Sequence, residues 1–578
     1  MRHACTAAER CFLSLCALGA CGAGPRGISP AHRLTARRDT RLADVRLSAF
    51  HGRHSSMPMI REDLTRAVQE ALAKAGLPEP ADGVVVQPSN RREHGDWTTS
   101  VVLQVAGAAG LKPRPAAEQL VDSLDASSVE HLDRIEIAGP GHLNFFLRPT
   151  WLHDVLRTVV ADGERYGRGD ALAGCRINLE FVSANPTGPL HAGGGRWVAV
   201  GDALANVLAA QAAEVHREYY LNDAGNQLDT FGASLLARYR HREPPTDGYQ
   251  GAYLIEMAER MRDELGDEVT EEQAREWGYH EVVRQLAEDL GRIGVHFDTW
   301  FSERTLHAGG DVERVLEDLR TRGAAYDEDG AVWLRSTEHG DSRDRVLVKS
   351  DGSTTYLCND IAYHRDKLSR GWNHLVDIWG ADHHGQVKSL QAGMQALGYP
   401  GTEPEVVLGQ LVKLVKDGQT VRMSRRTGDI VTLADILDEV NPDVARFVFL
   451  LQGIDTAQTF DLDVVTAASR ENPVYYVQYA YARIASIARM AEQRAVARRP
   501  LADADLTPLV HDAELDVLRQ LAEYPAVLLE AAELRAPHRV TTWVRELAAR
   551  FHVFYRDCRV ISDDDALTQA RLWLCEAC

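Results

Sequence analysis

The sequence from Asn185 to Trp197 reads NPTGPLHAGGGRW and lies between an apolar, strand-like run and an apolar, helix-like run. Glycines at the start of a helix allow a ligand to approach the backbone closely. The unpaired N–H groups and the dipole at that end attract phosphate. The stretch therefore predicts a strand–turn–helix that binds nucleotide, with a tight structural turn as the alternative. Its spacing matches neither the Walker lysine loop nor the Rossmann glycine fingerprint.

Strand-like and helix-like segments alternate on both sides of this stretch, from about residue 150 to about residue 440. Short apolar runs predict buried strands at 177–182, 375–379 and 406–414. Alternation of this kind is typical of a parallel sheet with helices on both faces. We therefore expect the centre of the chain to form a Rossmann-like α/β domain.

The whole chain is expected to be a multidomain α/β protein. Residues 58–148 predict a small α+β N-terminal domain. Residues 149–440 form the parallel-sheet domain in this interpretation, with helical insertions at about 228–338. Residues 441–578 are almost entirely helical in pattern and predict an all-α bundle.

Composition and charge are those of an ordinary globular protein. The net charge is −20, and no apolar run is long enough for a membrane span, so we expect a cytoplasmic protein with no membrane partner. The cysteines after residue 57 are scattered, which fits a reducing compartment and provides no zinc-ligand spacing. Residues 1–57 are rich in arginine and lack lysine, which fits either a targeting segment or an extended start ahead of Met57 or Met59.

Several motifs follow one another along the chain in an order that resembles the bacterial type of arginyl-tRNA synthetase, a class I aminoacyl-tRNA synthetase. The resemblance runs from about residue 59 to the C-terminus, and its specificity comes from the number of motifs. The motifs are HGDW at 94–97, AGPGHLN at 138–144, EFVSANPTGPLHAGGGR at 180–196, REYYLNDAGNQ at 217–227, VKSDGSTTY at 348–356, DIAYH at 360–364, WGADHHG at 379–385, VRMSRRTG at 421–428 and NPVYYVQYA at 472–480.

The resemblance implies an enzyme that ligates L-arginine to its tRNA at the expense of ATP, through an arginyl-adenylate. Its partners would be L-arginine, ATP and an arginine-accepting tRNA, with Mg²⁺ accompanying the nucleotide. Residues 58–148 would be an additional tRNA-binding domain, and residues 441–578 would bind the anticodon. The family also implies a monomer in the cytoplasm.

The resemblance places ATP at the glycine-rich turn, at the end of a central strand and on the basic stretch at 421–428. That stretch resembles the KMSKS motif of class I synthetases, with arginine at both lysine positions. The implied catalytic residues, which would stabilise negative charge on the leaving pyrophosphate, are His191, Arg422 and Arg425. The implied ATP-binding residues are His191, Gly193, Gly194, Gly380, Asp382, Met423 and Ser424.

The arginine pocket implied by the resemblance has acidic and aromatic walls. Carboxylates match the planar, paired donors of a guanidinium. For Glu180, a cationic ligand is favoured over a strand-end charge because a buried, unpaired carboxylate is costly. For Tyr356, a core aromatic is an equal alternative. The implied arginine-binding residues are Glu180, Ser183, Asn185, Tyr356 and Asp360.

The implied tRNA contacts of the helical region include Tyr479 and Arg483. Ring stacking combined with phosphate contacts is how proteins hold single-stranded RNA loops. From the pattern alone, tyrosines packed between helices and solvated arginines are the favoured alternative. No metal-ligand set is expected, because no cysteine or carboxylate completes a zinc spacing beside the pair His383 and His384.

The sequence departs from the family pattern at three places. Gly194 stands where the motif His-x-Gly-His has its second histidine, so His191, the helix N–H groups and Arg196 would have to bind more of the phosphate charge. Arginines replace both lysines of the basic loop, and the last helix is shorter than in the family. These departures keep open a catalytically impaired tRNA-binding paralogue or truncated copy. A small-molecule adenylyltransferase is a further alternative.

Overall fold

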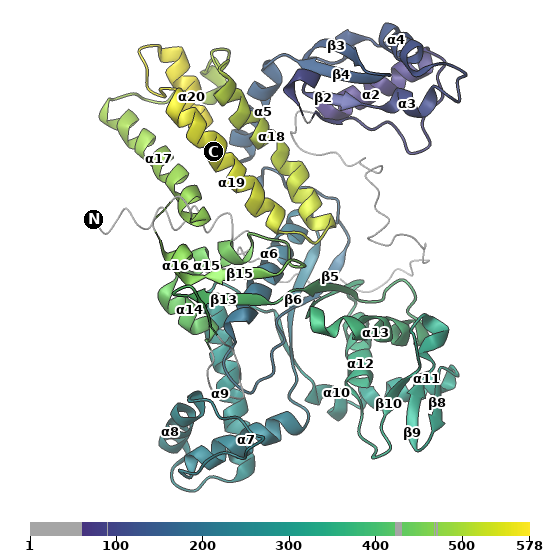
Figure 1. Ribbon diagram of the computed structural model, residues 1–578, viewed down its shortest axis with the longest axis vertical. Coiled ribbons are helices and arrows are strands. Elements are labelled where there is room, and N and C mark those ends of the chain that lie inside the picture. Colours follow the sequence, from purple (N-terminus) through teal and green to yellow (C-terminus); the bar gives the residue numbers. More distant parts are fainter. Residues whose placement is uncertain (1–59, 90, 422–430, 468, 470–471) are drawn as a thin grey trace, which may run out of the picture. The chain divides into compact units, whose positions relative to one another are not determined.

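The computed structural model describes residues 60–89, 91–421, 431–467, 469 and 472–578 (Figure 1). The described chain divides into two compact units. The first contains Gly169–Tyr476 and Val527–Thr542. The second contains residues 60–168, Val477–Ala526 and Trp543–Cys578. The predicted ATP-site residues Arg422, Met423, Ser424 and Arg425 lie outside the described residues.

A five-stranded, wholly parallel sheet is the centre of the first unit. Its strand order is β12-β11-β5-β6-β7. The strands are β5 (Arg176–Glu180), β6 (Glu214–Leu221), β7 (Thr299–Ser302), β11 (His374–Gly380) and β12 (Glu405–Gly409). The order changes direction between β5 and β11, and such a switch point is where parallel sheets bind ligands beyond the carboxyl ends of their strands. The predicted Rossmann-like domain is confirmed.

The segment 406–414, expected as one strand, forms two strands in different sheets. After β12, β13 (Val412–Lys416) pairs in parallel with β15 (Gln458–Asp461) and antiparallel with β14 (Gln419–Thr420). The chain changes direction at Gly409, where a Cβ atom would lie 1.8 Å from the Trp197 ring. Apolar periodicity could not reveal this change, because both halves are strand-like.

The span 228–338 also holds more than helices. It contains part of α7 (Asn226–Tyr239), then α8 (Tyr253–Leu265) and α9 (Glu271–Arg292), but the edge strand β7 follows them and belongs to the parallel sheet. The further elements up to residue 338 are α10 (Arg304–Ala308), α11 (Asp311–Thr321), β8 (Ala325–Glu328) and β9 (Ala331–Leu334). Strand β9 pairs with β8 and with β10 (Arg345–Val348) in a small antiparallel sheet.

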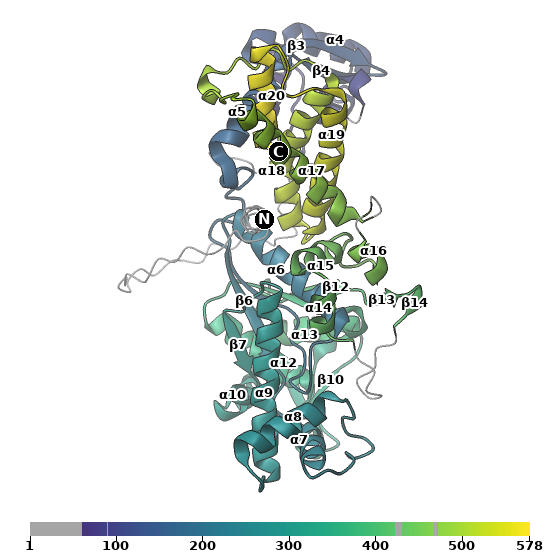
Figure 2. The ribbon, with the colours of Figure 1, turned by 90° about the vertical axis from the view of Figure 1, so that its left-hand side faces the viewer.

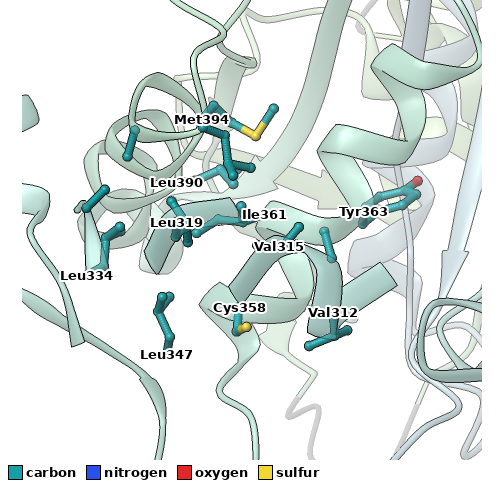
Figure 3. Packing of buried hydrophobic residues seen from close by; sticks show 14 of the residues in the cluster. Val312, Val315, Leu319, Leu334, Leu347, Cys358, Ile361, Tyr363, Leu390 and Met394 are labelled. Atoms are coloured by element: carbon teal, nitrogen blue, oxygen red, sulfur yellow. The ribbon is translucent and has the colours of Figure 1, made fainter. Parts of the chain in front are cut away.

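A hydrophobic core fixes helix α12 (Tyr356–Ser369) beside the parallel sheet. Ile361 of α12 packs among Leu319 of α11, Leu334 of β9 and Leu390 of α13 (His384–Ala396), and all four side chains are buried (Figure 3). Because these contacts leave α12 little freedom, the polar side chains on its other faces have defined positions.

The glycine-rich turn leads into α6 (Gly195–Ala210), which packs against α15 (Pro442–Phe449). The neighbouring helices of the first unit are α14 (Leu433–Glu439) and α16 (Leu462–Thr466). None of the helices in the described part of the chain is long and apolar enough to cross a membrane.

The second unit contains a four-stranded antiparallel sheet of order β1-β2-β4-β3 and a set of long helices. The strands are β1 (Gln87–Pro88), β2 (Trp97–Thr99), β3 (Leu132–Ala138) and β4 (His142–Leu147). Helices α2 (Ile60–Lys74), α3 (Val101–Val105) and α4 (Pro113–Ser123) belong to the same small domain.

The long helices α17 to α20 run together in both views (Figures 1 and 2). These four helices are α17 (Pro473–Gln493), α18 (Asp512–Glu533), α19 (His538–Asp557) and α20 (Asp565–Ala577). Helix α5 (Thr150–Asp162) lies much earlier in the chain. The predicted fold class is therefore confirmed.

Candidate active site

The chain is strained where it leaves β5 for the glycine-rich turn. Val182 has φ 71° and Ser183 has φ 39°, a region that β-branched residues avoid. The strained geometry brings the Ser183 hydroxyl to Glu180, where it donates to Oε1 at 2.9 Å. The Ser183 oxygen in turn accepts the N–H of Tyr220 at 3.1 Å. Strain of this kind is concentrated at functional sites, and here it lies at the switch point of the sheet.

His191 opens the short turn of 3₁₀ helix that leads into α6. Its Nδ1 accepts the N–H of Gly193 at 3.0 Å. The neutral imidazole therefore carries its proton on Nε2, which is the tautomer that donates to a phosphate oxygen from that atom. The predicted turn, with Gly193 and Gly194 before a helix N-terminus, is present.

Gly194 packs against a buried leucine. A Cβ atom at this position would lie 2.8 Å from Cδ1 of Leu190, which is 2% exposed. A histidine at 194 therefore requires Leu190 to move out of its packing. The local structure is built around glycine.

We expect Gly194→His to destabilise the enzyme and to leave the aminoacylation rate unchanged or lower. Overpacking beside Leu190 costs about 1–3 kcal/mol of the free energy of unfolding. Urea denaturation and the initial rate of tRNA charging measure the two effects, with Gly194→Ala as the smaller matched change. A strong gain in rate on introducing histidine would contradict this prediction and would indicate an impaired site.

Arg196 does not take the phosphate-binding role expected for it. Its side chain is fully buried, and Nη1 donates to the carbonyls of Thr456 at 2.8 Å and Gln410 at 3.2 Å. Nη2 donates to the carbonyl of Gly453 at 2.7 Å. The guanidinium thus ties α6 to the turn after β12 and to the loop before β15. The expectation was wrong because these carbonyls lie far away in sequence.

Glu180 already has a cationic partner. Its carboxylate is buried, and Oε2 accepts from Nζ of Lys367 at 2.7 Å. The premise that Glu180 is unpaired was therefore wrong. Lys367 is a residue that sequence reasoning missed. The available signal was its position on α12, seven residues after Asp360, which places the two near one helical face.

Asp360 has a carboxylate that can still accept hydrogen bonds from a ligand. It lies one turn after Tyr356 on α12, is half-buried, and accepts no side-chain hydrogen bond from any described residue. Burial raises the pKa of Asp360 to about 7, and the negative charges of Glu180 and Glu303 add to this effect, whereas His364 opposes it. The ring of Tyr356 is 63% exposed, which excludes the alternative of a core aromatic.

Further acceptors lie near this pocket. Glu303 is buried, and its Oε1 accepts from Nδ2 of Asn359 at 2.5 Å. Burial also raises the pKa of Glu303. Asn185 donates to the side-chain oxygen of Gln227 at 2.7 Å. The region is therefore rich in acceptors and suits a ligand with several N–H donors.

Gly380 is the last residue of β11, the strand next to β5, and Asp382 follows it. Because adjacent parallel strands end at the same edge of a sheet, these residues and the glycine-rich turn belong to one edge. A Cβ atom at Gly380 would lie 2.4 Å from Oδ1 of Asp382. The side chain of Asp382 is 79% exposed and is available to a ligand.

The chain that follows the basic stretch is attached to the glycine-rich turn. The N–H of Ala192 donates to the carbonyl of Val431 at 2.9 Å, and the N–H of Leu433 donates to the carbonyl of Leu190 at 2.7 Å. These two bonds hold the segment after residue 430 beside His191. The segment before residue 422 lies in the same region, because β13, whose Leu414 accepts the N–H of Val421, contacts the short turn at Ala192–Gly194.

One group of side chains in the described part of the chain has the spacing of metal ligands: Glu180, His364 and Asp377. The cation between two of them is the Lys367 ammonium, whose Nζ lies 2.7 Å from Glu180 Oε2 and 2.9 Å from Asp377 Oδ1. The group is therefore an internal ion-pair network.

The predicted tRNA-binding residues lie in the second unit. The guanidinium carbon of Arg483 on α17 is 4.4 Å from the ring centroid of Tyr479 and 4.5 Å from that of Tyr555 on α19. Nη1 of Arg483 also contacts Nδ1 of His552 at 2.9 Å. Tyr479 is 43% exposed, so this cluster presents an aromatic and cationic surface.

Three family models match successive parts of the chain. Residues 62–147 match the arginyl tRNA synthetase N terminal domain, 157–449 the tRNA synthetases class I (R) catalytic domain, and 477–578 the DALR anticodon binding domain. The chain belongs to the arginyl-tRNA synthetase family. This membership confirms the family and the arginine–tRNA ligase activity predicted from the sequence, and it gives no support to an impaired copy.

Relatives and solved structures agree with this family. The chain is 42% identical over 533 residues to an arginine–tRNA ligase of Bacillus licheniformis, an alignment that covers 90% of this chain and 95% of the relative. It is 44% identical over 518 residues to that of Syntrophotalea carbinolica, covering 88% and 93%. The solved arginyl-tRNA synthetase of Thermus thermophilus has the same fold, with a TM-score of 0.66 at 21% identity over 90% of this chain and 97% of that chain.

Proposed function

We propose that the carboxyl edge of the parallel sheet is where this arginine–tRNA ligase binds L-arginine and ATP. The main support for this proposal is the carboxylate of Asp360. It lies in an acidic region and has no hydrogen-bonded cation among the described residues. A guanidinium supplies the planar donors that Asp360 and Glu180 Oε1 can accept. Ser183, Asn185 and Tyr356 complete the pocket, with Asn185 placed to hold the amino-acid backbone.

The reaction needs no enzyme nucleophile. The carboxylate of arginine attacks the α-phosphorus of ATP in line, and the bond to pyrophosphate breaks, which gives arginyl-adenylate. A hydroxyl of the terminal adenosine of the tRNA then attacks the arginyl carbonyl carbon, and AMP leaves. The protein contributes by positioning the reactants and stabilising charge. Nε2 of His191 and the N–H groups at Gly193 and Gly194 would bind phosphate, and Asp382 would accept from the ribose hydroxyls.

The proposal also assigns a role to the basic stretch. Arg422 and Arg425, with Met423 and Ser424, would bind the phosphates that become pyrophosphate, as the family resemblance implies. Mg²⁺ would enter bound to ATP and supply charge neutralisation at the phosphates. Glu180, His364 and Asp377 have the spacing of metal ligands, but Lys367 already pairs with Glu180 in this group. We therefore expect phosphate oxygens and water to be the ligands of the ion.

Arginine-dependent charging of tRNA tests the proposed pocket directly. We would measure aminoacylation and pyrophosphate exchange with arginine, lysine and citrulline, each with and without arginine-accepting tRNA. Arginine alone should support charging, because lysine lacks the planar fork and citrulline lacks the charge. Equal use of citrulline would contradict a pocket that binds the guanidinium through carboxylates.

The raised pKa of Asp360 predicts a dependence of arginine binding on pH. A carboxylate with a pKa of about 7 is protonated below that pH and cannot pair with a guanidinium. We expect kcat/KM for arginine to fall about tenfold per pH unit below about pH 7, while kcat at saturating arginine falls less. Steady-state charging measured between about pH 5.5 and 8.5 tests this. A profile that is flat down to about pH 5.5 would contradict it, since ordinary carboxylates titrate lower.

The helical region is proposed to bind tRNA through the Tyr479–Arg483–Tyr555 cluster. Loss of one stacking ring costs about 1–3 kcal/mol of binding free energy. We therefore expect Tyr479→Ala and Tyr555→Ala each to raise KM for tRNA at least about fivefold, with KM for arginine unchanged. The control is Arg314→Ala, an exposed residue of α11 that pairs within its own helix. A change confined to KM for arginine would refute the assignment.

The remaining assignments follow the family. We propose that the small N-terminal domain at 58–148 is a second tRNA contact and that the helical C-terminal region binds the anticodon, as the DALR model describes. We further propose that the enzyme acts in the cytoplasm as a monomer. Size-exclusion chromatography with light scattering, with and without tRNA, tests the oligomeric state.

A further inference from the structure

A fully buried lysine lies beneath the proposed arginine pocket. Lys367 on α12 has no exposed surface, and its Nζ donates to Glu180 Oε2 at 2.7 Å and to Asp377 Oδ1 at 2.9 Å. It also lies 4.3 Å from the ring centroid of Tyr363. Burial alone would lower the pKa of Lys367, but Asp377, Glu180 and Glu218 outweigh it and raise that pKa, so the ammonium stays charged.

The network continues from Asp377 to the backbone of Asp360. Asp377 Oδ2 pairs with Nε2 of His364 at 2.7 Å, and Nδ1 of His364 pairs with the carbonyl oxygen of Asp360, also at 2.7 Å. Both partners of this imidazole are oxygen atoms, one from a carboxylate and one from a backbone carbonyl. A continuous path of buried hydrogen bonds therefore connects Glu180, through Lys367, Asp377 and His364, to Asp360.

The path joins the carboxylate of Glu180 to the backbone of Asp360, the residue whose carboxylate we also assign to the guanidinium, although the two residues come from different elements. Glu180 ends strand β5, and Asp360 lies on helix α12. Neither the sheet pairing nor the helix fixes the distance between them. The Lys367–Asp377–His364 path links them, because Asp377 lies on β11, which pairs directly with β5. Buried and fully bonded networks hold their members rigidly.

We propose that Lys367 is a positioning residue for arginine recognition, which holds Glu180 and Asp360 at the spacing that receives the guanidinium. The inference rests on the proposed arginine pocket. Lys367 itself does not touch the substrate in this assignment. It occupies Oε2 of Glu180 and leaves Oε1, which Ser183 orients, for the ligand.

Three substitutions at one position test this role. In Lys367→Met, Glu180 and Asp377 lose the cation that they share, and the pKa of Asp377, which Lys367 holds down, rises. We expect KM for arginine to increase at least about tenfold and KM for ATP to change less than about twofold. The decline of kcat/KM for arginine at low pH should begin at a higher pH than in the unsubstituted enzyme. Lys367→Gln should resemble Lys367→Met, and Lys367→Arg should restore part of the arginine affinity by returning the charge.

The control variant removes a partly buried ion pair of the same unit. Arg345→Met breaks the bonds from Arg345 to Asp341, at 2.8 and 2.9 Å, in the small antiparallel sheet. It should lower thermal stability without changing the ratio of the two KM values. Circular dichroism and thermal melting establish folding of each variant. Should Lys367→Met not fold, Lys367→Gln and Lys367→Arg still decide the question.

Unchanged KM for arginine in the folded Lys367 variants, or an equal rise in KM for arginine and ATP, would overturn the inference. Glu180→Gln separates this failure from failure of the proposed pocket. If Glu180→Gln raises KM for arginine but the Lys367 variants do not, the pocket stands and only the positioning role fails. If Glu180→Gln has no effect on arginine, the pocket assignment itself fails.

Discussion

Substitution of Asp360 by asparagine is expected to raise KM for arginine about 30- to 150-fold at about pH 8, with KM for ATP nearly unchanged. The amide keeps the shape of the carboxylate but loses its charge and places an N–H group opposite the N–H donors of the guanidinium. A hydrogen bond to a charged group contributes about 1.5–3 kcal/mol, and each 1.4 kcal/mol is a factor of ten in affinity. Steady-state tRNA charging with arginine and ATP varied separately measures both constants.

A carboxylate on the same helix provides the control for Asp360→Asn. Asp366 is half-buried on α12 and accepts from Nε of Arg370 at 2.8 Å, within its own helix. Asp366→Asn should leave both KM values close to those of the unsubstituted enzyme. Similar losses of arginine and ATP affinity in Asp360→Asn would mean that Asp360 supports the fold of the site and does not bind arginine.

The largest effect on stability is expected from Arg196→Leu, with a loss of about 3–5 kcal/mol in the free energy of unfolding. The substitution leaves the carbonyls of Gln410, Gly453 and Thr456 without their donor in a buried place. Each unsatisfied buried acceptor costs about 1–3 kcal/mol, partly recovered where water enters. Because these bonds join α6 to two loops of the sheet edge, the nucleotide site should also lose order.

Urea denaturation followed by intrinsic fluorescence measures this loss, and KM for ATP reports on the site. Arg314→Leu, on the exposed side of α11, is the control and should change the free energy of unfolding by less than about 0.5 kcal/mol. Arg196→Lys retains one charged donor and should be intermediate. A stable Arg196→Leu enzyme with weakened ATP binding would instead indicate that Arg196 binds phosphate, as the sequence alone suggested.

The parts of the fold that follow from local pattern were predictable. The run before Glu180, the glycines after His191 and the helix that follows them form a strand, a turn and a helix because each segment carries its own periodicity and its own turn residues. The division at Gly409 was not predictable, because only the position of the Trp197 ring requires a glycine there.

The sequence proposed members for the candidate site but did not reveal the hydrogen bonds between them. Family resemblance supplied Glu180 and Asp360, whereas the partner of Glu180 is separated from it by 187 residues in the chain. The spacing along α12 places Lys367 near the face of Asp360, but no local signal shows that Lys367 is buried or that Arg196 binds carbonyl groups and not phosphate. Both roles depend on long-range packing, and that packing decides which buried charges are already neutralised.

In the proposed pocket, arginine and the proton compete for the carboxylate of Asp360, because the pKa of this group is about 7. Thermodynamic linkage then requires that capture of arginine expels that proton to the solvent. The heat of binding would consequently include the ionisation heat of the buffer. In a cell, acidification would first weaken the binding of arginine and so reduce the supply of charged tRNA. The binding of ATP would be affected only at lower pH.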